Sequence, residues 1–111
     1  MKRDYKFYLN DMKESIKQIE EYTKNVTEEV FKKDKKIQDA VIRRLEIIGE
    51  ASRNIPRALK EKNKHIQWFQ ISQFRDFMVH SYFEASLTTI WKAVVKEIPI
   101  LKEGLKKISL V

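Results

Sequence analysis

Apolar residues recur along this chain at intervals of three and four, which is the spacing of amphipathic helices and not of strands. Glycine and proline occur only twice each, so few positions interrupt the pattern. The chain is therefore predicted to be all-α. Short connections between the predicted helices favour an antiparallel bundle of four to five helices, in a single domain over residues 1–111.

Two long helices are predicted in the N-terminal half. The first fades near Asn25, and Thr27 then stands where it can cap a second helical start, with Glu28 and Glu29 in its first turn. The longer helix that follows ends at Pro56, because the residue before a proline is pushed out of the α region. The predicted buried stripes are Tyr5, Leu9, Met12, Ile16, Ile19 and Thr23 in the first helix and Ile37, Val41, Leu45, Ile48, Ser52 and Ile55 in the second.

Gly49 lies inside the second stripe, where glycine costs about 1 kcal/mol relative to alanine. A glycine at such a position permits the close approach of another helix or of a ligand. Helix packing is the preferred interpretation.

The C-terminal half begins with a basic, mostly polar connector over 57–65, which has room for one helical turn. A third helix is predicted from about Ile66 to Ser81. A fourth starts after an N-cap at Ser86, and Pro99 breaks or kinks it before a short final helix. The residues predicted to be buried are Leu87, Ile90, Trp91, Val94, Val95 and Ile98, followed by Leu101, Leu105 and Ile108 in the final helix.

Aromatic residues in this half are spaced as anchors of the core or of a dimer interface, namely Trp68, Phe69 and Trp91. Base stacking is a second interpretation of them. His65 lies in the basic connector without a nearby partner in the sequence, and is expected at the surface.

The net charge of +7 creates a positive field that favours polyanions, and nucleic acid is the obvious candidate. A lysine-rich surface is often only a solvated one, however, and many lysines here are helical companions of glutamates. The chain has no cysteine, which excludes disulfides and thiolate metal sites and suits a reducing, cytoplasmic location.

Several classes of protein are disfavoured. No apolar run approaches the roughly 20 residues that span a bilayer, and the N-terminus does not resemble an export signal, so a soluble protein without a membrane partner is expected. Two histidines without cysteines offer no recognised metal-ligand spacing, and there is no glycine-rich phosphate loop. The third helix is too apolar to read DNA as a recognition helix. Neither a metal nor a cofactor is expected.

The segment 74–82 places ionisable groups in the least charged part of a chain that is 35% charged. Across residues 65–91 the only formal charges are Arg75, Asp76 and Glu84. Burying an unpaired charge is costly, so these groups should be compensated. An internal ion pair with a satisfied histidine and a functional site both fit the spacing.

On a helical wheel, Ser72, Asp76 and His80 line up on one polar side of the third helix, and Arg75 lies between that side and the core stripe. The core stripe contains Ile71, Phe74, Met78 and Tyr82. Asp76 could then hold the His80 imidazole in one tautomer. His80 can move a proton and Arg75 can neutralise charge on a phosphoryl oxygen, which are the parts of a metal-free ribonuclease.

Arg75, His80 and Tyr82 together match the signature of the HEPN superfamily, with four residues between the first two and one between the last two. Other positions resemble the HepT-like branch, and the likeness covers nearly the whole chain. These are residues 48–56, Trp68 ahead of the arginine, and Tyr82 and Phe83 leading into Leu87, Ile90 and Trp91.

The resemblance implies a toxin ribonuclease that acts without metal as a homodimer, with two copies of the motif facing each other across a composite cleft. Arg75 and His80 would be its catalytic pair. The residue after the arginine is often Asn in close relatives, and Asp76 adds negative charge near a site meant for RNA. This departure bears on the rate more than on the reaction type.

The resemblance also implies a partner, a minimal nucleotidyltransferase antitoxin that transfers AMP to a tyrosine of the motif region. Tyr82 is the matching acceptor, although a core aromatic with its hydroxyl at a polar edge is the alternative. Glu50 could face the cleft and help to position Arg75, or could simply be exposed.

Two hypotheses about function follow. The first is the ribonuclease toxin. The second is a noncatalytic helical module that binds a nucleotide or docks a nucleotidyltransferase.

Overall fold

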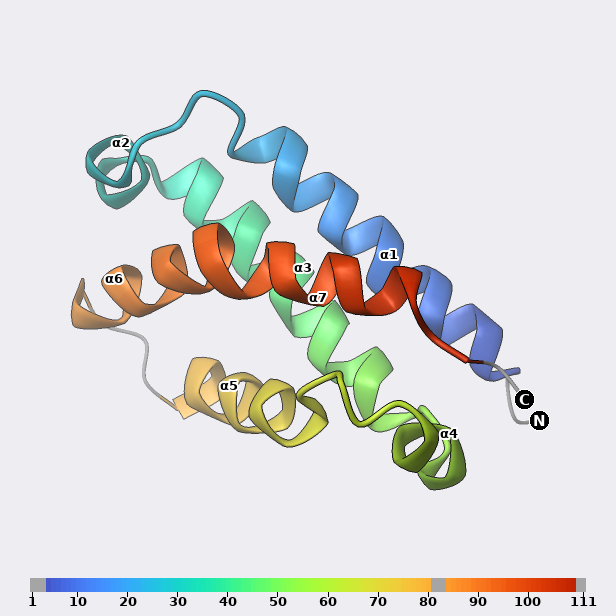
Figure 1. The fold of residues 1–111 in the computed structure, drawn as a ribbon. Coiled ribbons are helices and arrows are strands. Elements are labelled where there is room, and N and C mark those ends of the chain that lie inside the picture. The colour runs from blue at the N-terminus through green and yellow to red at the C-terminus, as the bar shows by residue number, and fades with distance from the viewer. Residues whose placement is uncertain (1–3, 81–83, 110–111) are drawn as a thin grey trace.

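The computed structural model describes residues 4–80 and 84–109, without the side chains of 79–80 and 84–86. Four long helical elements run antiparallel to their neighbours in sequence, and two short helices lie in the connections (Figure 1). The prediction of an all-α antiparallel bundle is confirmed. The long elements are α1 (Tyr5–Tyr22), α3 (Lys35–Arg53), α5 (Trp68–His80) and a C-terminal helix made of α6 (Glu84–Lys92), η1 (Ala93–Glu97) and α7 (Ile98–Lys106); the short ones are α2 (Glu28–Lys33) and α4 (Arg57–Lys62).

Side-chain caps explain where the first three helices begin. The Asp4 carboxylate accepts a hydrogen bond from the backbone N–H of Lys6 at 2.9 Å. Thr27 caps α2, as its position in the sequence predicted, with its hydroxyl accepting from a backbone N–H at 3.2 Å. Asp34 ends α2 and caps α3 at once, which allows the chain to change direction within one residue.

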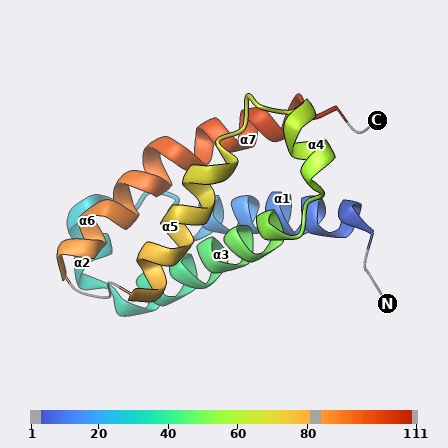
Figure 2. The ribbon, with the colours of Figure 1, turned by 90° about the horizontal axis from the view of Figure 1, so that it is seen from below.

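Helix α3 lies at the centre of the bundle, because it packs against α1 along one side and against α5 along another. The predicted stripes of α1 and α3 supply most of this core. Confirmed as buried are Leu9, Met12, Ile16, Ile19, Val41, Leu45, Ile48, Ser52 and Ile55. Figure 2 shows α5 lying across α3.

The side chain of Phe31 packs the short helix α2 against α6. Its side chain is fully buried, and its ring lies 5.2 Å from that of Trp91 on α6. The Gln38 side-chain amide donates to the Phe31 carbonyl at 2.9 Å. This contact confirms Trp91 as a core anchor, whereas Phe69 is 69% exposed and is therefore not part of the core of the single chain.

A buried asparagine organises the connector between α3 and α5, where the predicted helical turn is α4. The Asn63 side chain donates to the carbonyls of Leu59 at 2.8 Å and Ser109 at 2.9 Å, and it accepts from the Ser109 N–H at 2.7 Å. The Trp68 indole N–H donates to the Asn63 carbonyl at 3.0 Å, just where α5 begins. These bonds tie the connector to the C-terminal segment.

The C-terminal helix corrects two predictions. Ser86 is not its N-cap, because α6 already includes Glu84. Pro99 does not break it either, since α7 continues directly from η1, a π-helical segment in which the Ile98 N–H bonds to the Ala93 carbonyl five residues back. The predicted short final helix is present as α7, with Pro99 in its first turn. A proline would normally clash with the carbonyl four residues earlier, and that position falls inside the wider π turn.

Val95 was predicted to be buried and is 54% exposed, whereas its neighbour Val94 in η1 is buried. Ile108 packs against the core from beyond the end of α7. The rest of the predicted C-terminal stripe is buried or packed against the core.

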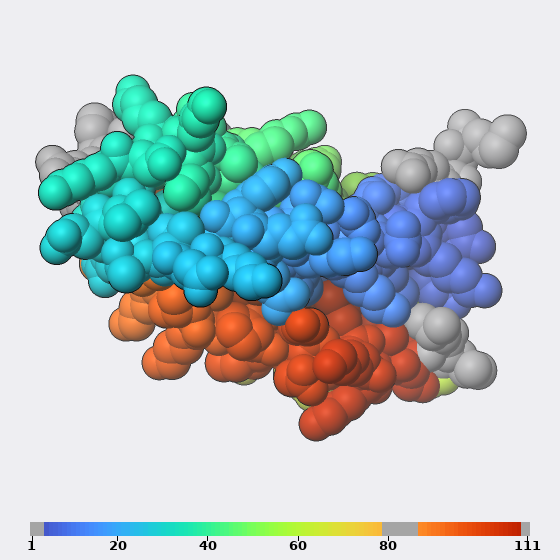
Figure 3. Space-filling model, turned by 90° about the horizontal axis from the view of Figure 1, so that it is seen from above, coloured from blue at the N-terminus to red at the C-terminus, as the bar shows by residue number. Residues whose placement is uncertain are grey.

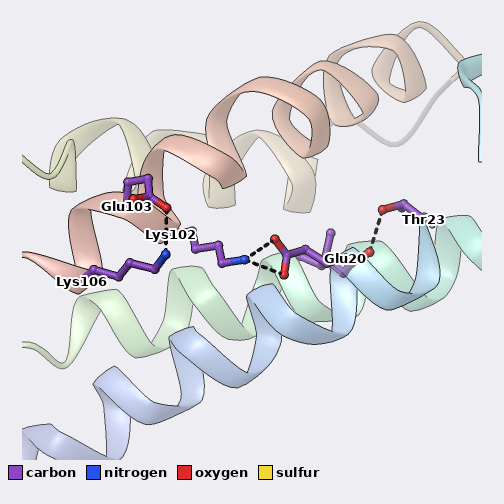
Figure 4. Close-up of polar contacts among 6 residues, drawn as sticks. Glu20, Thr23, Lys102, Glu103 and Lys106 are labelled. Atoms are coloured by element: carbon purple, nitrogen blue, oxygen red, sulfur yellow. Dashed lines mark hydrogen bonds and ion pairs between the residues drawn. The ribbon is translucent and has the colours of Figure 1, made fainter. Parts of the chain in front are cut away.

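Helix α7 also packs against α1. Figure 3 shows one broad face of the molecule, on which α1 lies between α2 and α3 on one side and the C-terminal helix on the other. Lys102 on α7 bonds both carboxylate oxygens of Glu20 on α1, at 2.9 and 3.2 Å (Figure 4). Both side chains are more than a third exposed, so this ion pair contributes little beyond the apolar contact beneath it. Among the described residues, no helix is long and apolar enough to cross a membrane.

Asn63→Ala should lower the free energy of unfolding by about 2–4 kcal/mol, because it removes three hydrogen bonds made by a buried side chain to Leu59 and Ser109. Chemical denaturation of the two proteins measures this difference. Asn54→Ala is the matched control, since the exposed Asn54 amide donates one hydrogen bond to the Glu50 carbonyl. Equal effects of the two substitutions would show that the buried network does not stabilise the connector.

Candidate active site

Arg75 lies on α5 where that helix crosses α3, and its side chain is 27% exposed. The aliphatic part of the side chain passes over Gly49. A Cβ atom added to Gly49 would lie 2.8 Å from the Arg75 Cβ and 2.9 Å from its Cγ. The predicted reason for this glycine, close approach of another helix, is thereby confirmed.

Two carboxylates hold the Arg75 guanidinium. Its Nη2 lies 3.2 Å from Glu50 Oε2 on α3, and its Nη1 lies 3.6 Å from Asp76 Oδ1. Both carboxylate side chains are more than half exposed, which leaves the ion pairs open to solvent and to competing anions. Glu50 Oε2 also lies 3.9 Å from Arg53 Nη1.

The guanidinium therefore has more than one role available. The carboxylates fix its position at the surface, and a phosphate could replace either of them, because a guanidinium binds both anions through the same paired N–H groups. The ion-pair interpretation and the functional-site interpretation of this segment are thus compatible.

An open cleft of about 460 Å³ adjoins this ion-pair cluster. It lies between α1, α3 and α5. Its lining consists of Tyr8, Asp11, Arg43, Glu46, Ile47, Glu50, Ala51 and Arg75. Both arginines in this lining face a space large enough for part of a nucleotide.

Sequence reasoning missed the contribution of α1 and most of that of α3. Arg43, Glu46, Ile47 and Glu50 follow one another at helical spacings of three, one and three residues, so they form one stripe beside the buried one. That spacing was a signal in the sequence. What could not be inferred without the crossing of α5 over α3 was that this stripe meets Arg75.

The structure describes the remaining predicted site residues only in part or not at all. His80 is the last residue of α5, one helical turn after Asp76, and its side chain lies outside the described part of the structure. Tyr82 lies outside the described residues altogether. The structure thus brings Arg75, Glu50 and Asp76 together and leaves the predicted contact of Asp76 with His80 as a prediction.

His65 is exposed, as predicted, and its Nε2 lies 2.9 Å from the carbonyl oxygen of Gly104, a partner remote in the sequence. Among the side chains that the structure describes, no three His, Asp or Glu residues converge closely enough to hold a metal ion.

A comparison with known protein families covers the residues described above. The sequence model of the family described as "Ribonuclease HepT-like" matches residues 12–108. The chain belongs to the HepT-like ribonuclease family. The match includes all of α3 and α5, and therefore both sides of the Arg75 cluster.

Two relatives illustrate the family. "Probable ribonuclease HepT" of Thermococcus cleftensis is 46% identical over 108 residues, which are 97% of this chain and 98% of that protein. A protein of Methanocaldococcus jannaschii named "Gamma-glutamylcyclotransferase and putative RNase" is 50% identical over 108 residues. The chain spans 49% of that second protein's length, so only part of it has a counterpart here. No solved structure matches the chain.

The HepT-like assignment confirms the resemblance drawn from the sequence.

Proposed function

We propose that this protein is a metal-independent endoribonuclease toxin, with Arg75 and His80 as its catalytic residues. The observation that carries this proposal is the partly buried Arg75 guanidinium, held between Glu50 and Asp76 beside an open cleft. Membership of the HepT-like family and the ribonuclease names of its relatives support RNA as the substrate.

In the proposed reaction, the ribose 2′-hydroxyl attacks the adjacent phosphorus. A bond forms between the 2′ oxygen and phosphorus, and the bond from phosphorus to the 5′ oxygen of the next nucleotide breaks. His80 moves the proton that the 2′-hydroxyl gives up, and the leaving oxygen gains one. Arg75 stabilises the charge that develops on the phosphoryl oxygens. The products are a 2′,3′-cyclic phosphate and a 5′-hydroxyl, so no metal-bound water is needed.

A homodimer would complete this site. If two chains face each other with their α5 helices, the two copies of Arg75 and His80 form one composite cleft that provides separate groups for taking and giving the proton. The +7 charge of each chain would attract RNA to it. We also propose that residues 1–111 act as one domain and that the protein works in the cytoplasm.

Regulation would come from a minimal nucleotidyltransferase antitoxin. We propose that it transfers AMP from ATP to the Tyr82 hydroxyl, with pyrophosphate as the leaving group. Tyr82 lies two residues after His80, so the added phosphate would bring negative charge to the place where the RNA backbone must bind.

Purified wild-type protein in EDTA should cleave a labelled mixture of tRNA and mRNA and leave cyclic phosphate ends, because neither proton transfer nor charge stabilisation requires a metal. His80→Ala and Arg75→Ala should each reduce the rate by at least about 100-fold. Gel analysis with identification of the product ends measures this.

Circular dichroism and sizing of each variant provide the control for folding and assembly. Loss of cleavage in EDTA with recovery on adding a divalent cation would contradict the metal-independent mechanism. No cleavage by folded, dimeric protein that is unmodified at Tyr82 would instead favour the noncatalytic interaction module.

Asp76→Asn should raise the affinity for RNA by about two- to fivefold at low salt, because it removes one of the two carboxylates that compete with phosphate for Arg75. Filter binding to a substrate with a 2′-deoxy group at the cleavage site measures this without turnover. Glu103→Gln on α7 is the control for net charge, since it makes the same change away from Arg75. Equal gains from both variants would show that only the overall field matters.

Tyr82→Phe should prevent modification by the proposed minimal nucleotidyltransferase antitoxin, because the variant lacks the acceptor hydroxyl. After coexpression, mass spectrometry should find one added AMP group on the wild type and on Tyr22→Phe, and none on Tyr82→Phe. An adduct that persists on Tyr82→Phe would place the acceptor elsewhere.

A further inference from the structure

Gly49 lies in the C-terminal part of α3, directly beneath the side chain on which the proposed chemistry depends. A Cβ atom there would lie 2.8 Å from the Arg75 Cβ, 2.9 Å from Cγ and 3.2 Å from Cδ. Real Cβ atoms do not approach other carbons this closely. The absence of a side chain at residue 49 therefore determines how deeply Arg75 can sit against α3.

The close contact includes an atom that cannot move by itself. Rotation about χ1 could move the Cγ and Cδ atoms of Arg75, but its Cβ is fixed to the backbone of α5. An alanine at position 49 would therefore require α5 to shift relative to α3 as well as a new course for the arginine side chain.

Glu50 holds the other end of the same side chain. Its carboxylate lies 3.2 Å from the guanidinium, one residue along α3 from the glycine that receives the aliphatic stem. Two consecutive residues of α3 thus constrain Arg75. Gly49 determines how closely its aliphatic stem lies against α3, and Glu50 holds its guanidinium in one direction.

We propose that Gly49 is a positioning residue, which together with Glu50 places the Arg75 guanidinium where the scissile phosphate binds. This inference rests on the proposed function and extends it to a residue that contacts no substrate. A displacement on the order of 1 Å in a catalytic group can cost about 100-fold in rate, so the contact distances bear directly on activity.

The chain offers a matched control in Gly104 on α7. A Cβ atom there would lie 3.1 Å from Cγ1 of Ile66 and 3.7 Å from Cδ2 of His65. Gly104→Ala gains the same helix propensity and also makes a tight contact, but with the side chain of Ile66, which lies apart from Arg75.

Gly49→Ala should lower kcat for RNA cleavage by at least about tenfold, with KM within about threefold of wild type. Gly104→Ala should stay within about twofold on both parameters. Thermal unfolding of both variants checks the fold. Glu50→Gln should also lower kcat, by about threefold or more, and it introduces no steric clash should Gly49→Ala fail to fold.

The Arg75 side-chain Nε–Hε resonance, assigned by its loss in Arg75→Ala, gives a readout that needs neither RNA nor activity. It should move in Gly49→Ala and Glu50→Gln and stay unchanged in Gly104→Ala. In addition, Gly49→Ala combined with Arg75→Ala should cleave RNA with the same residual kcat as Arg75→Ala alone, because the glycine acts through the arginine.

An unmoved Arg75 resonance in folded Gly49→Ala, or a kcat within twofold of wild type, would overturn the inference. Additive losses of kcat in the double variant would do so as well, and would indicate a general packing role. If wild-type protein cleaves no RNA, the proposed function fails, whereas the resonance still decides whether Gly49 places Arg75.

Discussion

The constraint on which the structure depends is that α3 must be buried on two sides at once. One side packs against α1 and the other against α5, so any change in the depth of either contact is felt by the other. At Gly49 the stem of Arg75 on α5 occupies the space that a side chain on α3 would need. The position of the candidate catalytic cation is therefore set by the packing of the bundle and not by a flexible loop.

This packing gives the Arg75 cluster a mixed character. The stem of the side chain is held by apolar contact, whereas the guanidinium is held by Glu50 and Asp76, which are both largely exposed. Exposed ion pairs contribute little to stability, so the two carboxylates can be replaced by a phosphate at small energetic cost. A rigid stem and an exchangeable set of partners are suitable for the catalytic role that we propose for Arg75.

Much of this could be predicted from the sequence, because helical stripes and caps are local properties. The stripes of α1 and α3, the Thr27 cap and the need for space at Gly49 all follow from residues within a few turns of one another. The cleft did not follow, since Tyr8, Arg43 and Arg75 are brought together by the angle at which α5 crosses α3. Asn63 was missed for a similar reason, because its partner Ser109 is remote in the sequence.

The C-terminal helix accommodates a proline at a position where proline would ordinarily interrupt a helix. Pro99 would ordinarily end a helix, yet the carbonyl that it would strike belongs to Val95, inside the π turn. The wider turn and the proline are thus compatible. The π turn interrupts the regular series of backbone hydrogen bonds, which would leave one N–H without an acceptor, and proline has no N–H. Together they let one continuous helical element extend from Glu84 to Lys106, so a single element connects the end of the molecule that holds Phe31 to the end that holds Asn63.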